Sequence, residues 1–377
     1  VPAKLTELSP VATKHQPFTV KHFSKWAKDL VLDNGEGWVL EPFQERFLED
    51  VFAGASACWL VVPEGNGKTT LVAGLCLYHI QHTEEGSVPV AASSRQQAEL
   101  LYRQAEGFCM RSPKLAVGEW FKCQEGYRRI KCDRMHSRIQ IFAADDATAD
   151  GIIPTMAVIE ELHRHRNLKL YDTWRGKYGK RQGQAIVIST AGEPGGEFEL
   201  RREQIRQKSP ERTVDGSFTR SAGDQLVMHE YALQEGEDPE DMAAVLRANP
   251  FSGITLQTLQ DKRESSDFSL VHWRRFTCNL PTRSDAAAIQ EKEWFDARTE
   301  EWAPEGEEIW AGLDLGWKYD TTALVPLWMR TAEERVCGPA CVLVPPRDGN
   351  FMSAQVVRDA LTSMHERNPI RVLVMDI

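Results

Sequence analysis

The feature that most constrains the fold is an apolar run that leads into a loop of small residues and then into a helical pattern. The run is Ala57–Val62, the loop is Pro63-Glu-Gly-Asn-Gly-Lys-Thr-Thr70, and the helical pattern covers Leu71–Ile80. Small residues let backbone N–H groups surround a phosphate, while a lysine supplies charge and a hydroxyl supplies a Mg²⁺ ligand. This order predicts a buried strand, a phosphate-binding loop and a helix.

Within the loop, each residue type has an expected task. Lys68 binds the β- and γ-phosphates and Thr69 holds Mg²⁺. The loop departs from the pattern G-x4-G-K-S/T, because Val62 stands where the first glycine is expected. An ordinary turn is the alternative, since Gly-Lys-Thr is common by chance, but the flanking strand and helix favour nucleotide binding. The predicted nucleotide-binding residues are Gln44, Glu64, Gly65, Asn66, Gly67, Lys68, Thr69 and Thr70.

Gln44 is included because it precedes the first strand at the start of a predicted helix. It ends the segment Leu40-Glu-Pro-Phe-Gln44, and the helix continues over 45–52. A side-chain amide donates one hydrogen bond and accepts another, which suits the edge of an adenine base. The alternative is an exposed helix residue without a ligand.

An acidic pair follows a second apolar strand, Met156–Ile159. Glu160 and Glu161 stand at its end. A phosphate-loop ATPase needs one acid for Mg²⁺ and a neighbour that orients and deprotonates the attacking water. We assign Glu160 to the metal and Glu161, as the catalytic residue beside Lys68, to the water. Glu160 is one methylene longer than the usual aspartate, and surface glutamates that close a strand are the alternative.

A third strand, Ala185–Ser189, ends in hydroxyl residues. Ser189 and Thr190 are expected at the carboxyl edge of the sheet, where open α/β sheets bind ligands, and would couple hydrolysis to movement. An ordinary strand end is the alternative. Helical stretches separate these segments, which predicts an α/β fold with a parallel sheet. The predicted strands are Ala57–Val62, Val88–Ala92, Ile139–Ala143, Met156–Ile159 and Ala185–Ser189.

The charge balance excludes a passive coat for nucleic acid. With 55 acidic and 45 basic residues, the net charge is −10. A local DNA-binding patch is still compatible with this charge, and the basic stretch Arg164–Arg181 is the candidate, with a solvated loop as its alternative. No apolar run has the length of a membrane helix, so no membrane is expected. The eight cysteines form no CxxC pair and are interpreted as buried thiols.

A second α/β pattern occupies the end of the sequence. Three antiparallel strands, then a helix leading to a parallel strand, is how an RNase H-like fold begins. Asp314 and Asp376 would converge from neighbouring strands, as two-metal cleavage of phosphodiesters with Mg²⁺ or Mn²⁺ requires. Apolar flanks suggest that Asp314 is buried, where an unpaired charge is costly. Asp320 is a further candidate metal ligand, with a local role in its turn as the alternative. The expected elements are Ile309–Leu315, Thr322–Trp328, Cys341–Val344, Ser353–Glu366 and Ile370–Ile377.

Taken in order, these motifs resemble the large terminase subunits of tailed bacteriophages. The matching segments are Leu40-Glu-Pro-Phe-Gln44, Pro63-Glu-Gly-Asn-Gly-Lys-Thr69, Ser93-Ser-Arg-Gln-Gln-Ala98, Asp150-Gly-Ile-Ile-Pro154, Glu160-Glu-Leu-His163, Ser189-Thr-Ala-Gly192, Ala248-Asn-Pro250 and the Asn279 region. The resemblance implies an ATPase that drives double-stranded DNA into a procapsid and an endonuclease that cuts concatemers. It also implies a portal protein, a small terminase subunit and a homo-oligomeric ring. Such a protein is expected in the host cytoplasm, transiently at the portal.

The resemblance suggests three parts: a motor domain over 1–205, a linker or lid over 206–300 and an incomplete RNase H-like domain over 301–377. Because such nucleases use a further acid after Asp376, we expect the nuclease of this form to be defective or very weak. A superfamily-2-like helicase or translocase is one alternative. A catalytically silent nucleotide-binding assembly protein is the other, and only Glu160 and Glu64 support it, since many terminases carry a basic residue at the position of Glu64.

Overall fold

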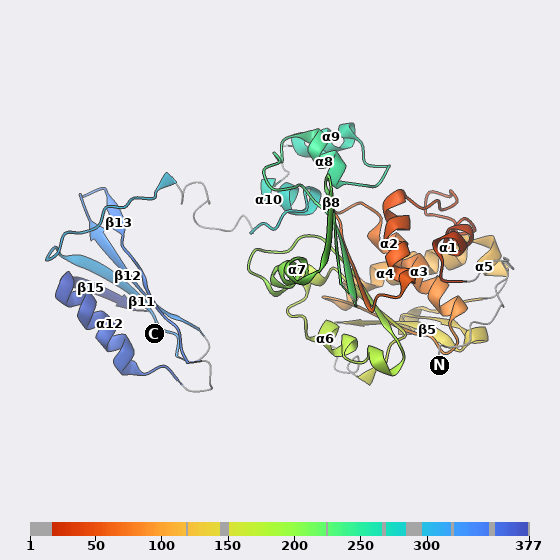
Figure 1. Cartoon of the computed structure of the whole chain (residues 1–377), viewed down its shortest axis with the longest axis horizontal. Coiled ribbons are helices and arrows are strands. Elements are labelled where there is room, and N and C mark those ends of the chain that lie inside the picture. Colours follow the sequence, from red (N-terminus) through yellow and green to blue (C-terminus); the bar gives the residue numbers. More distant parts are fainter. Residues whose placement is uncertain are drawn as a thin grey trace. The chain divides into compact units, whose positions relative to one another are not determined.

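The computed structural model describes residues 17–117, 120–143, 151–223, 225–265, 269–283, 296–317, 320–346 and 351–375. The chain divides into two compact units, Val1–Ala286 and Ala287–Ile377 (Figure 1). Each unit has its own sheet. None of the helices in the described ranges is both long and apolar enough to cross a membrane.

The first unit contains a ten-stranded sheet in the order β3-β4-β5-β2-β6-β7-β1-β10-β9-β8. The strands from β5 to β10 in this order pair in parallel, and the strands at both edges pair antiparallel. The bounds are β1 Ala57–Val61, β2 Ser87–Ala92, β3 Lys122–Gln124, β4 Arg129–Cys132, β5 Ser137–Ala143, β6 Met156–Glu160, β7 Gln184–Ser189, β8 Glu211–Asp215, β9 Phe218–Ala222 and β10 Leu226–Tyr231.

The five strands predicted from sequence are all present in this sheet, with ends that differ by no more than two residues. β1, β2, β6 and β7 are fully or nearly fully buried because helices cover both faces of the sheet, which explains their apolar runs. In β5, buried residues alternate with exposed or half-buried ones. β1, the strand before the phosphate loop, lies between β7 and β10. The predicted parallel α/β sheet of the motor is therefore confirmed.

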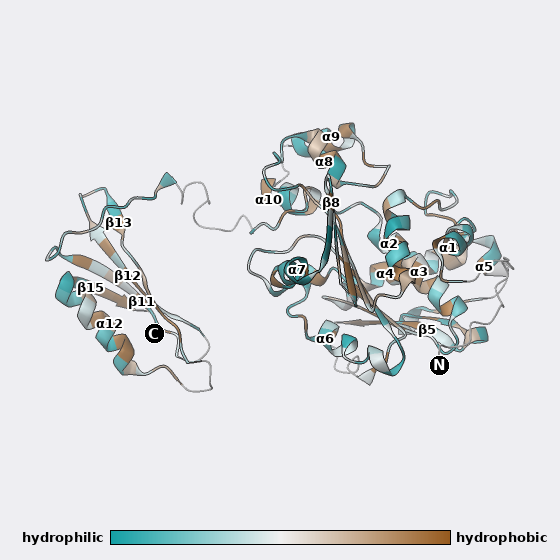
Figure 2. Ribbon diagram, in the orientation of Figure 1, coloured by the Kyte–Doolittle hydropathy of each residue, from teal (hydrophilic) through white to brown (hydrophobic). Residues whose placement is uncertain are grey.

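Helices cover both faces of the sheet and form a separate hydrophobic core on each. On one face, Trp59 of β1 stacks on Phe198 and meets Tyr171 edge to face. Figure 2 shows the strands inside this unit as brown and α7 as largely teal. The helix bounds are α1 Val20–Ala27, α2 Pro42–Ala53, α3 Lys68–His82, α4 Arg95–Arg111, α5 Pro113–Val117, α6 Lys169–Arg175 and α7 Glu197–Lys208, with short 3₁₀ turns at Leu162–Arg164 (η4) and Tyr178–Lys180 (η5).

The structure differs from the predicted linker or lid over 206–300. β8, β9 and β10 extend the ten-stranded sheet, so part of this range belongs to the first unit. β10 could not be predicted from the sequence because His229 and Glu230 interrupt its apolar pattern. Both residues are buried in the structure. The following helices have a small core of their own around Val245, Leu259 and Trp273. Their bounds are α8 Met242–Ala248, α9 Leu256–Glu264, α10 Leu270–His272 and a π-helical turn, η6, Trp273–Thr277.

The second unit contains a five-stranded sheet and one long helix. β11 pairs antiparallel with β12 and parallel with β15, while β13 and β14 both pair with β12. Val357 of α12 packs against Ala311, Leu313 and Leu324 of the sheet. The predicted strands and helix are present, and β13 is an addition. The bounds are β11 Ile309–Asp314, β12 Thr322–Met329, β13 Arg335–Cys337, β14 Cys341–Leu343, α12 Ala354–Arg367 and β15 Ile370–Met375.

Candidate nucleotide-binding site

The loop after β1 has the backbone shape that phosphate binding requires. Gly65 and Gly67 have φ angles of +80° and +73°, in the left-handed region that a side chain disfavours. Gly67 immediately precedes α3, which begins at Lys68. The N-terminal N–H groups of a helix attract anions. The structure therefore supports an anion site at this point, where the sequence predicts it.

Lys68 is folded back against its own loop. Its Nζ donates hydrogen bonds to the backbone oxygens of Val62 at 2.8 Å and Pro63 at 3.1 Å. The side chain is 6% exposed and its Nζ lies 3.7 Å from Oε1 of Glu161. Burial lowers the pKa of Lys68, and the nearby acids oppose this shift. Val62, which replaces the expected glycine, thus takes part in the site through its carbonyl group.

Glu160 forms a buried oxygen cluster with Thr69. The Thr69 hydroxyl donates a 2.8 Å hydrogen bond to Oε1 of Glu160. Glu160 is 1% exposed, and no described residue donates a hydrogen bond to its Oε2. Burial, with a smaller contribution from the charge of Glu161, raises the pKa of Glu160 to about 8. A buried carboxylate oxygen without a partner, beside a hydroxyl, fits Mg²⁺, which takes oxygen ligands and usually keeps waters and substrate phosphates.

Glu161 lies in the opposite electrostatic environment. Burial alone would raise its pKa, but Lys68 and His163 together lower the pKa to about 2. Its φ angle of +48° is unusual for a residue with a side chain and is typical of functional sites. The two adjacent glutamates therefore favour different protonation states, which is a common basis for different chemical roles.

Ser189, at the end of β7, meets the segment that follows the acidic pair. Its Oγ accepts a hydrogen bond from the backbone N of His163 at 3.1 Å and lies 3.0 Å from Nδ1 of the same residue. Thr190 Oγ1 is 3.3 Å from that Nδ1. Both Ser189 and Thr190 are fully buried. The structure thus brings the predicted coupling residues to the acidic pair through His163.

Gln44 lies beside the loop and also caps its helix. Its Oε1 accepts a hydrogen bond from the backbone N of Glu41 at 3.1 Å. Gln44 is 3% exposed, so it is not the exposed helix residue of the alternative interpretation. A Cβ built on Gly67 would be 3.6 Å from Nε2 of Gln44, which places the amide against the phosphate loop. Thr70 lies half-buried in the first turn of α3.

Asn249 and Asn279, which the sequence marks only as part of the family resemblance, hold the phosphate loop in place. Asn66 is fully buried and donates a 2.9 Å hydrogen bond to Oδ1 of Asn249. Asn279 accepts from the backbone N of Ala191 at 2.7 Å and donates to the backbone oxygen of Val61 at 3.3 Å. In the sequence, Asn249 and Asn279 stand out only as members of the matching segments Ala248-Asn-Pro250 and the Asn279 region.

Glu64 is an acid in an anion-binding loop, and cations surround it. Arg164 and His272 each have a nitrogen 3.7 Å from a Glu64 carboxylate oxygen. The backbone N of Glu64 donates to the backbone oxygen of Phe276 at 2.9 Å. The π-helical turn η6 therefore contacts the phosphate loop directly. Such turns are frequent at functional sites.

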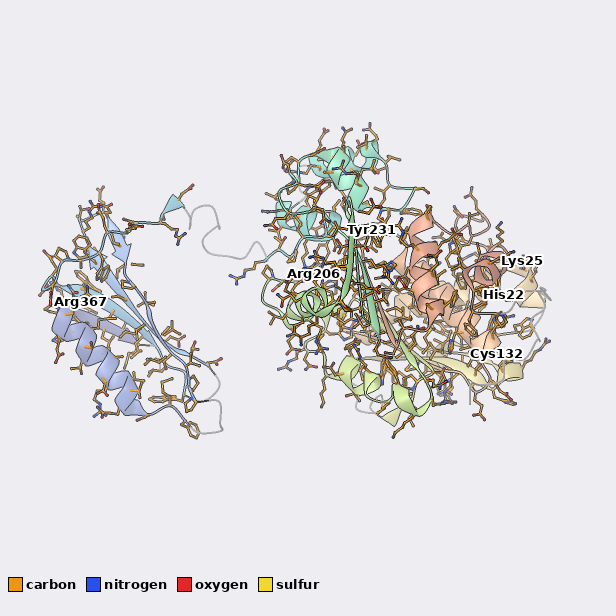
Figure 3. The ribbon with its side chains drawn as sticks, in the orientation of Figure 1. His22, Lys25, Cys132, Arg206, Tyr231 and Arg367 are labelled. Atoms are coloured by element: carbon orange, nitrogen blue, oxygen red, sulfur yellow. The ribbon has the colours of Figure 1, made fainter. Side chains whose placement is uncertain are left out.

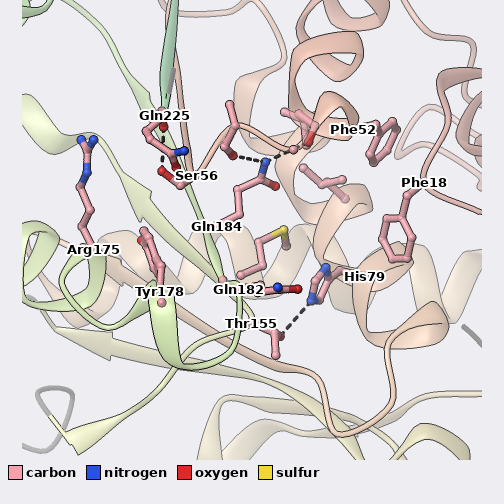
Figure 4. A pocket seen from close by; sticks show the side chains of 17 residues that line it. Phe18, Phe52, Ser56, His79, Thr155, Arg175, Tyr178, Gln182, Gln184 and Gln225 are labelled. Carbon is pink, nitrogen blue, oxygen red and sulfur yellow. Dashed lines mark hydrogen bonds between the residues drawn. The ribbon is translucent and has the colours of Figure 1, made fainter. Parts of the chain in front are cut away.

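A separate cavity of about 630 Å³ lies at the opposite edge of the sheet. It includes Ser56, which precedes β1, and Thr155, which precedes β6 (Figure 4). His79 of α3 contacts Thr155 Oγ1 at 2.9 Å on one side of this cavity. The cavity contains none of the predicted nucleotide-binding residues.

The basic stretch Arg164–Arg181 is largely solvent-facing, apart from its apolar residues. Arg175 donates to the Tyr171 hydroxyl at 2.9 Å, and Arg181 donates to the backbone oxygen of Glu85 at 3.0 Å. Arg166, Lys169 and Lys180 are exposed.

In the second unit, the predicted nuclease acids are only partly described. Asp314 ends β11 but is exposed, unlike the buried carboxylate that we expected from its apolar flanks. Solvent reaches it because alternate residues of β11 face outward. Asp320 is also exposed, and Asp376 lies outside the described residues. The register pairs Leu313 with Met375. Among the residues that the structure describes, no group of three or more His, Cys, Asp or Glu side chains is placed to hold a metal ion.

Together, the mixed α/β sheet and the loop after its central strand are typical of phosphate-loop proteins. A family model, "Terminase large subunit, ATPase domain", matches residues 55–205. The large terminase subunit of Enterobacteria phage HK97 is 23% identical over 309 residues, which is 77% of this chain and 58% of that relative. The crystal structure of the HK97 large terminase has a TM-score of 0.58 and 19% identity, covering 94% of this chain and 79% of that one.

Over residues 55–205 the chain is similar to the ATPase domain of terminase large subunits, in agreement with the resemblance that the motif order indicates. The similarity to the HK97 structure shows a common fold. The chain spans less than two thirds of the length of the curated relative.

Proposed function

We propose that the first unit binds and hydrolyses ATP. The observation that carries the proposal is the contrast between Glu160 and Glu161, which are adjacent and buried but differ in the direction of their pKa shifts. In this proposal Lys68 exchanges its hydrogen bonds to Val62 and Pro63 for bonds to phosphate oxygens. Thr69 and Glu160 hold Mg²⁺, which neutralises charge on the phosphates when it is bound.

Glu161 is the proposed base. Its lowered pKa keeps the carboxylate ionised at neutral pH. The carboxylate orients a water and takes one of its protons as the water oxygen bonds to the γ-phosphorus. The bond from that phosphorus to the oxygen of ADP breaks, leaving ADP and phosphate. Lys68, 3.7 Å from Glu161, fixes the carboxylate near the phosphate loop.

The test compares hydrolysis by the wild type and by Glu161→Gln. Removal of the proposed base should lower kcat by about 100-fold or more, while binding of an ATP analogue is retained. Glu84→Gln, at an exposed position of the same unit, is the matched control. Equal rates in the wild type and Glu161→Gln would overturn the proposal and favour the silent assembly protein.

We further propose that hydrolysis moves double-stranded DNA through a portal into a procapsid, in a homo-oligomeric ring that also contacts a small terminase subunit. The match to the terminase ATPase-domain model and the exposed basic stretch support this role. Such a motor contacts phosphates, whose binding is independent of base sequence and sensitive to salt. The proposed location is the host cytoplasm, at the portal during packaging. The helicase alternative requires a second motor domain, and the described residues after Gly192 form sheet strands and a small helical cluster instead.

For the second unit, we propose an RNase H-like endonuclease role with two Mg²⁺ or Mn²⁺ ions. The parallel pairing of β11 with β15 and the position of Asp314 at the end of β11 support it. We expect at most weak nicking of supercoiled plasmid in Mn²⁺. Any such nicking should be lost in Asp314→Asn and kept in Asp359→Asn, a substitution on α12. Equal nicking by both variants would contradict a role for Asp314.

A further inference from the structure

We propose that His163 is a positioning residue that orients the Glu161 carboxylate and links it to Ser189 and Thr190. The proposal rests on the proposed ATPase function. The side chain of His163 is 1% exposed, and its Nδ1 lies 3.0 Å from Oε2 of Glu161. The same nitrogen lies 3.0 Å from Ser189 Oγ and 3.3 Å from Thr190 Oγ1. One buried nitrogen thus faces the proposed base and both coupling residues.

The hydrogen-bond pattern determines which ring nitrogen carries the proton. Nε of Arg164 lies 3.3 Å from Nε2 of His163, and a guanidinium only donates, so Nε2 is the acceptor. The Ser189 hydroxyl donates to the backbone oxygen of Thr190 at 3.1 Å, which leaves Oγ as an acceptor for His163. His163 is therefore the neutral tautomer with hydrogen on Nδ1, which donates to Ser189 and lies 3.0 Å from Oε2 of Glu161.

The surroundings of His163 favour this neutral form. Burial lowers its pKa, and the positive charges of Arg164 and Arg275 act in the same direction, while Glu161 opposes them. The Phe198 and Phe276 rings lie 6.3 and 6.0 Å from its ring. His165 contacts the backbone oxygen of Glu160 at 3.0 Å. Burial, with a smaller contribution from the charge of His163, lowers the pKa of His165. These groups come from η4, α7 and η6, so three elements enclose the imidazole.

This geometry gives His163 a task on each side. Toward Glu161, the positively polarised Nδ1–H lies 3.0 Å from Oε2 and holds the carboxylate in place, although the backbone there is strained at a φ of +48°. Toward β7, the same nitrogen donates to Ser189 Oγ. His163 therefore fixes the position of the proposed base relative to the end of β7.

The experiment compares His163→Asn, His163→Gln and His163→Ala. Asparagine places an amide nitrogen near the position of Nδ1, whereas the glutamine amide reaches the position of Nε2. His163→Ala should lower kcat by about 100-fold, the effect of a misplaced catalytic group, and His163→Asn should retain at least tenfold more activity than His163→Gln. The affinity for an ATP analogue should stay within about twofold of the wild type, because His163 contacts none of the proposed phosphate ligands.

The division of the effect between kcat and KM separates this role from a structural one. Loss of a positioning residue should lower kcat and leave the KM for ATP unchanged, whereas a general loss of structure should change both. His136→Asn, on an exposed histidine with a positive φ, is the control and should match the wild type.

Three outcomes overturn the inference. One is a wild-type kcat in His163→Ala while Glu161→Gln is inactive, which leaves the proposed ATPase intact. Another is equal activity of His163→Asn and His163→Gln, a comparison that remains informative if the alanine variant fails to fold. The third is a wild type without ATP hydrolysis, which overturns the proposed function as well.

Discussion

The Thr69 hydroxyl donates a 2.8 Å hydrogen bond to Oε1 of Glu160, which joins the first turn of α3 to the end of β6. The contact prepares an oxygen pair for a cation, but it does so around a carboxyl that burial keeps protonated up to a pH of about 8, the value of its pKa. Proton and metal therefore compete for Glu160.

We expect this competition to appear in the magnesium dependence of ATP hydrolysis. Mg²⁺ needs the ionised carboxylate, so the half-saturating Mg²⁺ concentration should rise as the pH falls from 8 to 6, by up to about tenfold per unit. Measurement of hydrolysis against Mg²⁺ concentration at pH 6, 7 and 8 checks this. Glu160→Asp should keep the pH dependence, and Glu160→Gln should abolish it. A half-saturation point that is independent of pH in the wild type would contradict the assignment of Glu160.

Asn249 should matter for both stability and nucleotide affinity. Its Oδ1 accepts from Asn66 in the phosphate loop, and its Nδ2 donates to the backbone oxygens of Val245 and Thr277 at 2.9 Å. Asn249→Ala leaves these buried groups without partners, which should cost roughly 1–3 kcal/mol of unfolding free energy and weaken binding of an ATP analogue. Urea unfolding and fluorescence titration measure the two effects. Asn34→Ala, at an exposed position, should change neither, and an unchanged Asn249→Ala variant would show that the loop holds its shape alone.

The acid in the phosphate loop should reduce the affinity for ATP. Glu64 repels the incoming phosphates and occupies Arg164 and His272, which lie 3.7 Å away. Glu64→Gln removes the negative charge and should lower the KM for ATP severalfold, most clearly at low salt, where exposed charges are least screened. Steady-state hydrolysis at two salt concentrations provides the measurement, with Glu85→Gln as the surface control. A higher KM for ATP in Glu64→Gln would contradict this prediction and would mean that Glu64 contributes to ATP binding.

A buried ionic network around Arg202 should contribute strongly to the unfolding free energy of the first unit. Arg202 is fully buried and bonds Glu199 at 2.7 Å and Glu230 at 3.0 Å; Arg206, labelled in Figure 3, also bonds Glu230. Arg202→Ala leaves buried carboxylates without their main partner and should cost roughly 3–5 kcal/mol. The adjacent Arg201→Ala breaks only the exposed pair with Asp172 and should cost about 1 kcal/mol or less. Urea unfolding compares them, and equal losses would contradict this ranking.

The strands and the phosphate loop could be predicted because their signals are local. Continuous apolar runs mark β1, β6 and β7, and the small residues before Lys68 mark the loop. β10 was missed because His229 and Glu230 look exposed in sequence. Their burial depends on distant partners, Asp50 at 2.7 Å and Arg202 at 3.0 Å. Such pairings arise only in the folded chain.

The chemistry of the site was predictable in residue type but not in environment. The sequence identifies two adjacent glutamates, yet their opposite pKa shifts depend on burial and on Lys68 and His163. The contact between Asn66 and Asn249 spans 183 residues, and no local pattern announces it. For Asp314, apolar flanks suggested burial, but the alternation of β11 turns the carboxylate to solvent.

The central position of β7, between β6 and β1, also bears on how the protein matures. The site takes its parts from distant segments, such as Thr69 and Glu160, which are 91 residues apart. Parallel pairing must join 57–61, 156–160 and 184–189 before Lys68 can meet Glu161. Non-local pairing of this kind is slow to form. A chain that binds nucleotide has therefore finished assembling its sheet, and a bound nucleotide in turn favours the assembled chain by mass action. Nucleotide availability would thus protect newly made motor domains from unfolding before any DNA is present.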